Sequence, residues 1–229
     1  MPWDVRTEVG SSADEILGEA RKALLVMLVA IGAIWALQIA NWADGYGLDQ
    51  RFGILPRDFF RLPDIVVAPF LHFSWTHIEA NSGPLFVFGC LAAFRGVSRF
   101  VGVTAVVVVT SGLAVWLFQS SNELTVGASG VIYGYFGYVV VKGLFDRRLL
   151  DVAVGVVMAL SFAYILVAVV PGTPGVSWEG HLGGLVGGVF SGWLFRIHRP
   201  EVTQLGIPSA TSTQPRWRRS AGKPRTRGA

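Results

Sequence analysis

The sequence predicts an all-α membrane protein built as a bundle of six transmembrane helices. Hydrophobic residues make up 52% of the 229 residues and charged residues only 15%, and the mean hydropathy is +0.52. This composition is typical of a chain surrounded mainly by lipid. In addition, six apolar runs are each close to the roughly 17–25 residues that a helix needs to cross a bilayer. These runs are residues 23–42, 78–94, 100–118, 124–144, 149–170 and 181–197.

Residues 1–22 form a polar segment before the first apolar run and contain five acidic residues. A secretory signal would instead begin with a short basic region, so we expect no cleaved signal peptide. The run 23–42 is therefore predicted to stay in place as a span. We expect residues 1–22 to be a cytoplasmic segment and residues 23–197 to form the membrane domain.

The positions of Lys and Arg predict the orientation, because positively charged loops remain in the cytoplasm. Sixteen of the 19 cations lie in the N-terminal segment, around the links after the second and fourth runs, or at the C-terminal end, whereas the links after the third and fifth runs have none. Both termini are thus predicted to be cytoplasmic. Residues 44–76 form the first outer loop, which is long, rather apolar and interrupted by Pro56, Pro63 and Pro69. We expect this loop in or on the outer leaflet.

Residues 198–229 are rich in Pro, Ser, Thr and Arg and are predicted to be a disordered cytoplasmic tail. They hold seven Lys or Arg and one acidic residue, so the net charge of +4 for the whole chain originates in the tail. This location does not indicate a nucleic-acid partner. The basic cluster 216–219 is compatible with contact to anionic lipid and equally with a solvated tail. The single cysteine, Cys90, has no partner for a bridge or a metal cluster and is interpreted as a packing residue.

Polar side chains inside spans are candidates for function, because a charge at a helix centre costs roughly 2.5–3.5 kcal/mol on insertion. The candidates are His77, Asn81, Ser129 and His181. The second, fourth and sixth spans run in the same direction, so residues near their first turns should share one layer. At about 1.5 Å per residue, Ser129 is predicted to lie some 7–8 Å below the start of its helix. His77 and Asn81 are four residues apart and share one helical face.

Glycines are expected to bring two of these helices close together. They recur at every fourth position from Gly180 to Gly192, and Gly130 and Gly134 repeat the spacing in the fourth span. Small residues at this spacing allow helix backbones to approach each other. Taken singly, Ser129 could bond its own backbone and His181 could be a packing residue. Their combination with His77 and Asn81 favours a functional site.

Three motifs carry a resemblance to a known family. The string Gly127-Ala128-Ser129-Gly130, with Tyr133 one turn later, resembles the G-x-S-G motif of the rhomboid intramembrane serine proteases. The string from His181 to Gly184, with Gly188, is similar to that family's H-x-x-G-x-x-x-G helix, and residues 72–81 are similar to its H-x4-H-x3-N segment. The motifs occur in the family's order and cover residues 72–188, half of the chain.

The resemblance implies a six-helix rhomboid-like bundle with a membrane-associated first outer loop. It implies that Ser129 is the nucleophile and His181 the general base and then acid. It further implies that His77, Asn81 and the Ser129 backbone N–H donate to the oxyanion, and that Tyr133 packs against His181. Gly127, Gly130 and Gly184 are expected to support this arrangement. No carboxylate matches a third catalytic position, since Glu179 lies on a different face from His181, so we expect a dyad without metal or cofactor.

The implied activity is endopeptidase cleavage of transmembrane or membrane-anchored proteins near the outer face of the bacterial plasma membrane. The expected partners are these membrane-spanning substrates and the lipid bilayer, with no nucleic acid, and the oligomeric state is left open. Substrate entry would require the fifth span and the loop 171–177 to yield. Two features depart from the family: Arg51-Phe52 is the nearest match to its Trp-Arg pair, and Pro84 is expected to strain the second span.

Three other functions are compatible with parts of the sequence. An inactive relative that escorts membrane proteins is disfavoured because both Ser129 and His181 are present. A small transporter or channel is disfavoured because the sequence has no internal repeat and no charged path across both leaflets. An enzyme acting on lipid in an apolar pocket is the weakest alternative.

Overall fold

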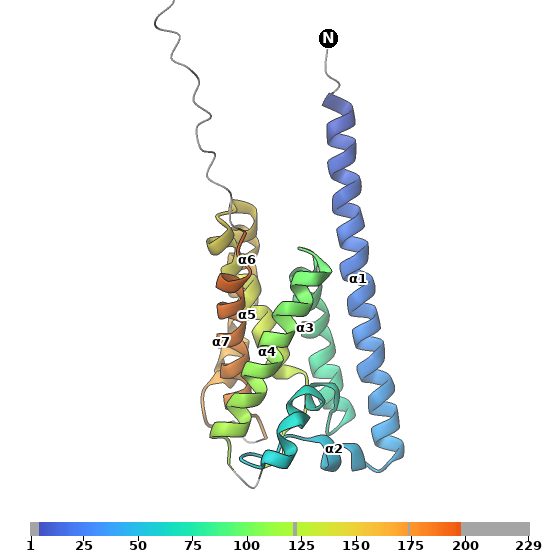
Figure 1. The fold of residues 1–229 in the computed structure, drawn as a ribbon, viewed down its shortest axis with the longest axis vertical. Helices are drawn as coiled ribbons and strands as arrows, with labels where there is room; N and C mark the ends of the chain where they lie inside the picture. The colour runs from blue at the N-terminus through green and yellow to red at the C-terminus, as the bar shows by residue number, and fades with distance from the viewer. Residues whose placement is uncertain (1–4, 121–122, 174, 198–229) are drawn as a thin grey trace, which may run out of the picture. The chain divides into compact units, whose positions relative to one another are not determined.

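The computed structural model describes residues 5–120, 123–173 and 175–197, with side chains from residue 13 onward. The predicted tail, residues 198–229, lies outside the described residues. Within the described residues the regular elements are all helices, and the β pairing is limited to an isolated antiparallel bridge between Ile54 and Thr125. Its elements are α1 (Val5–Ala43), α2 (Gly47–Phe52), η1 (Phe59–Val66), η2 (Ala68–Phe70), α3 (Trp75–Ala93), α4 (Val97–Phe118), α5 (Ser129–Asp146), α6 (Leu149–Phe162), η3 (Ala163–Val169) and α7 (Trp178–Leu194), where η denotes a 3-10 helix (Figure 1).

Long helices occupy all six predicted apolar runs, and three of them are long and apolar enough to cross a membrane. Within the described residues these three are Ala13–Ala43, Val97–Phe118 and Leu149–Val169. Helices α3, α5 and α7 are shorter or more polar, and they carry the candidate site residues. The structure thus supports a helical membrane bundle, while the count of six spans stays a prediction.

Helix α1 begins at Val5, well before the apolar run, and passes through residue 23 without a break. Residues 13–22 include Ala, Leu, Glu, Arg and Lys, which are good helix formers. Lys22 and Glu19, three residues apart, also form an ion pair at 2.7 Å. Polarity alone therefore does not end the helix before the membrane-facing part begins.

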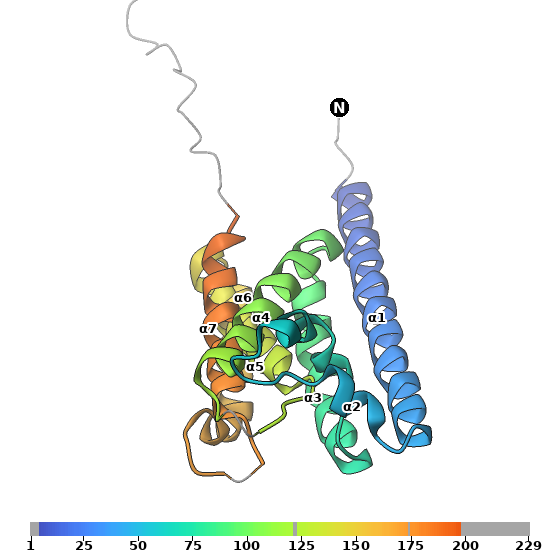
Figure 2. The same ribbon diagram turned by 60° about the horizontal axis from the view of Figure 1, so that its bottom comes forward.

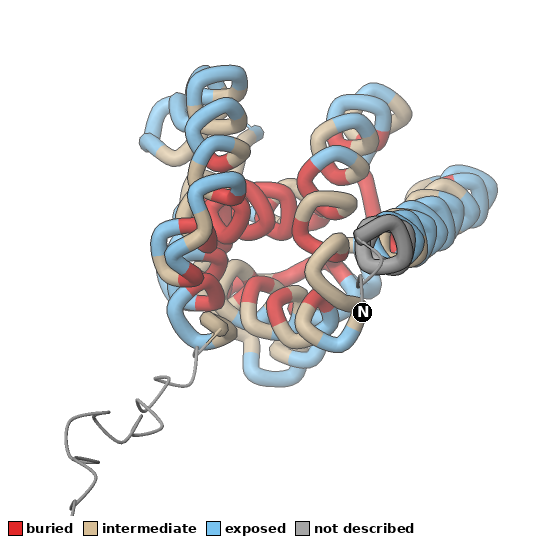
Figure 3. Tube along the Cα trace, turned by 90° about the horizontal axis from the view of Figure 1, so that it is seen from above, coloured by how far each residue is buried: buried red, intermediate tan, exposed pale blue. Residues whose placement is uncertain are grey.

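Helix α5 lies at the centre of the bundle. Every residue from Gly130 to Val139 is buried, and the helix packs against α3, α4, α6 and α7. Seen from above, its trace is surrounded by the other helices, while α1 is largely exposed (Figure 3). The exposed apolar side chains of α1 and α6 suit contact with lipid.

Helices α5 and α7 make the predicted close contact through glycine. A Cβ at Gly184 would overlap the carbonyl oxygen of Gly130, and one at Gly188 would overlap the carbonyl oxygen of Gly134. Any side chain at either position would therefore push the two backbones apart. The expectation that the glycine stripe brings these helices together is confirmed.

Two predicted boundaries are wrong. The fourth run does not start as a helix at residue 124, because the chain stays extended until Ala128 and α5 begins at Ser129. Ser129 is thus the first helical residue and does not lie a full turn or more inside the helix. The fifth run is not one α-helix, since α6 ends at Phe162 and continues as η3. In contrast, α3 passes unbroken through Pro84.

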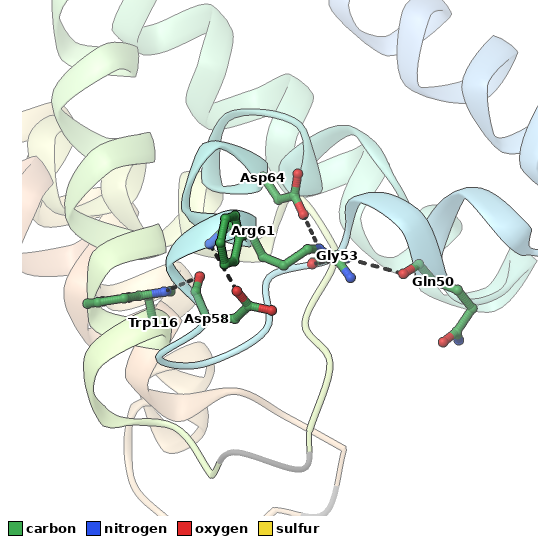
Figure 4. Close-up of polar contacts among 7 residues, drawn as sticks. Gln50, Gly53, Asp58, Arg61, Asp64 and Trp116 are labelled. Atoms are coloured by element: carbon green, nitrogen blue, oxygen red, sulfur yellow. Dashed lines mark hydrogen bonds and ion pairs between the residues drawn. The ribbon is translucent and has the colours of Figure 1, made fainter.

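The segment between α1 and α3 is held by Arg61 rather than by Arg51. Arg61 donates to the carbonyl oxygens of Gly53 (2.7 Å) and Gln50 (3.2 Å) and pairs with Asp64, as Figure 4 shows. Among the described residues, Arg51 makes a single, exposed ion pair, with Asp44 at 3.8 Å. In the same segment, the Trp116 indole N–H of α4 donates to the carbonyl oxygen of Asp58 at 3.0 Å. These bonds satisfy backbone groups that an irregular segment would otherwise leave unpaired.

We call the end of the bundle at which α3, α5 and α7 begin the site end. Helix α2 and the two 3-10 helices η1 and η2 lie at this end (Figure 2). The loop between η3 and α7 also lies there. The first turns of the three helices that carry the candidate residues are therefore surrounded by irregular chain.

Candidate active site

Ser129 is positioned by an extended stretch that leads into α5. Thr125 and Ile54 exchange two backbone hydrogen bonds of 2.9 and 3.1 Å, and the Gly127 N–H donates to the Ala68 carbonyl at 3.0 Å. Gly127 has a φ of 126°, which favours glycine. A Cβ there would also lie 2.8 Å from Nε2 of His77. The G-x-S-G motif is thus explained locally by a turn that needs glycine for its backbone angle and for space.

His181 lies in the first turn of α7 and contacts Ser129 directly. Its Nε2 is 2.8 Å from the Ser129 Oγ, and its Nδ1 is 2.9 Å from the carbonyl oxygen of Ala168. A carbonyl oxygen can only accept, so Nδ1 carries the proton. In the neutral ring Nε2 is then free to accept the serine proton. His181 is buried, with 7% of the residue's surface exposed.

Tyr133 and η3 hold the imidazole from two sides. The Tyr133 ring stacks on His181 with centroids 4.2 Å apart and an interplanar angle of 15°. The Tyr133 hydroxyl donates to the Ile165 carbonyl at 2.5 Å. Ile165 and Ala168 both belong to η3, so this short segment supplies an acceptor to each ring. Sequence reasoning predicted the stacking but missed the two carbonyls, because any residue type has one.

His77 and Asn81 approach the serine from α3. Ser74 caps this helix by accepting from the His77 N–H at 3.1 Å. A Cβ at Gly127 would meet the His77 ring and would lie 3.7 Å from Asn81 Nδ2. Asn81 is 6% exposed, and its Nδ2 has no hydrogen-bond partner among the described residues. A buried amide donor without a partner beside the serine suits an acceptor that arrives with a ligand.

His72 belongs to the first outer loop, outside the predicted spans, and its ring packs against that of His77. The two rings meet edge to face with centroids 5.0 Å apart. Burial, and then the neighbouring His77, lower the pKa of His72 to about 3. His72 is therefore neutral at physiological pH and does not add a charge beside His77.

A cleft of about 900 Å³ opens onto the serine. Ser129, His181, His77 and Asn81 all line it, together with residues of the loop between η3 and α7. A second cavity, of about 30 Å³, also borders Ser129 and His181. Its size is sufficient for one or two water molecules. The four polar residues singled out in the sequence therefore line one space that is large enough for an extended peptide and lies beside room for water.

The part of the chain that the structure describes contains no group of side chains suited to bind a metal ion. No three His, Cys, Asp or Glu side chains gather there as a candidate metal site. Cys90 is free and half-buried.

The fold and the site define a helical membrane protein with a serine and histidine pair in a cleft at one end of the bundle. Residues 58–198 match a family model described as Rhomboid domain. The chain therefore belongs to the rhomboid family.

Three relatives illustrate how far the similarity extends. An uncharacterised protein of Mycobacterium tuberculosis is 33% identical over 198 residues, which cover 83% of this chain and 82% of the relative. An uncharacterised protein of Mycobacterium leprae is 37% identical over 201 residues, or 84% of this chain and 78% of the relative. A putative rhomboid protease of Bacillus subtilis is 27% identical over 178 residues, or 75% and 84%. The similarity thus reaches beyond the matched domain into α1.

Proposed function

We propose that this protein is an intramembrane serine endopeptidase that uses Ser129 and His181 as a catalytic dyad. The proposal depends on the 2.8 Å contact between Ser129 Oγ and His181 Nε2. The Nδ1–H of the same ring donates to the Ala168 carbonyl oxygen, so Nε2 is left to accept the serine proton. A serine hydroxyl is a poor nucleophile until a base within hydrogen-bond reach takes its proton. The name of the Bacillus subtilis relative, a putative rhomboid protease, supports the same activity.

In the proposed reaction, Ser129 Oγ attacks the scissile carbonyl while His181 Nε2 takes the hydroxyl proton. The tetrahedral intermediate collapses when His181 returns this proton to the leaving amine, which leaves an acyl group on Ser129. Water then attacks the ester while His181 Nε2 takes a proton from it, and His181 returns this proton to Ser129 Oγ as the carboxylate product leaves. The cavity of about 30 Å³ beside both residues has room for this water.

The negative charge on the intermediate needs fixed donors, each of which contributes up to roughly 3–4 kcal/mol in studied hydrolases. We assign this role to Asn81 Nδ2, to the His77 ring and to the backbone N–H of Ser129. Ser129 is the first residue of α5, where backbone N–H groups have no acceptor within the helix. The positive end of the helix dipole also favours a negative charge there.

His181 differs from the base of a triad in its second partner. A carboxylate would stabilise the imidazolium by charge, whereas the Ala168 carbonyl is neutral and offers only a dipole. The carbonyl nevertheless fixes the tautomer and the plane of the ring. The stacked Tyr133 limits rotation further, so the site relies on orientation more than on a neighbouring charge.

We propose that the protein crosses the bacterial plasma membrane six times, with both termini in the cytoplasm. The site end would then face outward, and substrates would be spanning segments that unwind there. The cation distribution supports this orientation. The cytoplasmic segment would comprise residues 1–22, the membrane domain residues 23–197, and the cytoplasmic tail residues 198–229.

The deciding experiment is to incubate the purified protein, reconstituted in vesicles, with a panel of single-span substrates. Wild type should cleave at least one of them, and Ser129→Ala should cleave none. Both proteins should show the same melting temperature, so that the loss reflects chemistry. A folded wild type that cleaves no member of the panel and shows no serine reactivity would instead favour a non-proteolytic relative.

A further inference from the structure

A buried glutamine, Gln119, connects the serine side of the site to the histidine side. Gln119 caps the end of α4 and is 3% exposed. It lies outside the three motifs that carry the resemblance to the family. Its side chain nevertheless bonds to both chain segments that carry the dyad.

On the histidine side, Gln119 holds the start of α7. The Ser177 hydroxyl donates to Gln119 Oε1 at 2.5 Å and is much farther from its other acceptor, Glu179, at 3.4 Å. Ser177 also caps α7 by accepting from the Gly180 N–H at 3.3 Å, and its carbonyl accepts from the His181 N–H at 3.2 Å. The hydroxyl that orders the first turn of α7 is therefore itself oriented by Gln119.

On the serine side, Gln119 holds the extended stretch before α5. Its Nε2 donates to Thr125 Oγ1 at 2.6 Å and makes a longer contact of 3.4 Å with the Glu123 carbonyl. Thr125 lies four residues before Ser129 and also forms the backbone bridge to Ile54. One amide thus uses its oxygen for the segment of the base and its nitrogen for the segment of the nucleophile.

We propose that Gln119 is a positioning residue that sets the distance between Ser129 and His181. This inference rests on the proposed dyad. An amide suits the role because it offers one acceptor and two donors in a fixed plane. A carboxylate or an apolar side chain of similar size would lose at least one of the two connections. Because reactivity falls steeply when reacting groups are misplaced by about 1 Å, with losses near 10²-fold, a small relaxation here should be measurable.

The test is the rate at which a fluorophosphonate labels Ser129 in the full-length protein in detergent, measured over a range of reagent concentrations. Gln119→Met keeps the volume and removes both bonds. It should lower the maximal labelling rate about 10–100-fold while the half-saturating reagent concentration changes less than about threefold. The matched control is Thr104→Val, which removes a 2.7 Å bond to Tyr135, also between α4 and α5, about 22 Å away along α4. It should label at the wild-type rate.

A second pair of variants keeps the test decisive if Gln119→Met does not fold. Thr125→Val removes the acceptor hydroxyl at nearly constant size and should lower the maximal rate in the same way, whereas Thr125→Ser restores the hydroxyl and should recover most of it. Equal rates for wild type, Gln119→Met and Thr125→Val would overturn the positioning role and leave the dyad intact. If wild type itself is not labelled, or if Ser129→Ala is labelled equally, the dyad fails and this inference fails with it.

Discussion

Replacing Asn81 with alanine separates a role in the reaction from a role in the fold. Asn81 Nδ2 is buried and has no partner among the described residues. If this group waits for the oxyanion, Asn81→Ala should lower kcat by about 10²–10³-fold, which corresponds to about 2.7–4 kcal/mol of transition-state stabilisation. KM should change little, because the bond strengthens only as charge develops.

In contrast to kcat, the thermal stability of Asn81→Ala should change little. Truncating a buried donor that is bonded to another protein group typically costs about 1–3 kcal/mol, but Asn81 Nδ2 has no such partner among the described residues. The melting temperature of Asn81→Ala should therefore stay close to that of wild type. Cleavage of a single-span substrate and thermal unfolding in the same detergent would measure both quantities.

The matched control is Gln38→Leu in α1. Gln38 is buried as well, and its amide has no hydrogen-bond partner among the described residues, but it does not line the cleft. This variant should cleave at the wild-type rate. A wild-type kcat for Asn81→Ala, or a large fall in its melting temperature with no fall in kcat per folded molecule, would refute the oxyanion assignment.

Three further predictions concern protonation and the loop. Cleavage should decline on acidification as His181 takes up a proton, since an unperturbed histidine titrates near pH 6.5; a rate that rises steadily from pH 7 to 5 would contradict the role of base. His72 has its pKa lowered to about 3 in the folded state, so the unfolded chain binds more protons between about pH 6.5 and 3. The contribution of His72 to the free energy of unfolding should be fully present above about pH 6.5 and should fall by about 1.4 kcal/mol per pH unit below it. Thermal unfolding of His72→Phe should show a flatter dependence on pH. Arg61→Met should lower the free energy of unfolding by about 1–3 kcal/mol, because it leaves the Gly53 carbonyl and Asp64 without their donor; an unchanged melting temperature would argue against this anchoring.

The sequence was sufficient to predict the features of this protein that depend on residue type. Apolar runs located the long helices, and glycine spacing identified the contact between α5 and α7. The pairing of Ser129 with His181 followed from two motifs on helices of the same direction. In each case a special side chain, or the lack of one, is needed at that position, so the pattern is visible in the residues themselves.

Features that depend on backbone geometry were missed or misplaced. The depth of Ser129 was wrong because the stretch before it is as apolar as a helix but is held extended by the bridge to Ile54. Arg51-Phe52 was the nearest match to the family's Trp-Arg pair, and the sequence did not indicate which residue anchors the loop. In the structure Arg61 holds the loop, because its guanidinium reaches two carbonyls that only the folded loop brings together.

The break between α6 and η3 links the geometry of the fifth predicted span to the chemistry. A continuous α-helix ending at residue 170 would use the Ile165 carbonyl for its own hydrogen bond to the N–H of Val169, whereas the Ala168 carbonyl, in the last turn, would have no partner within the helix. In the structure both residues belong to η3, where the Ile165 carbonyl accepts from Tyr133 and the Ala168 carbonyl accepts from His181. The same segment leads directly into the loop that lines the cleft. Any movement of η3 that admits a substrate would therefore also alter the orientation of the base, so access to the cleft and alignment of the dyad are physically connected.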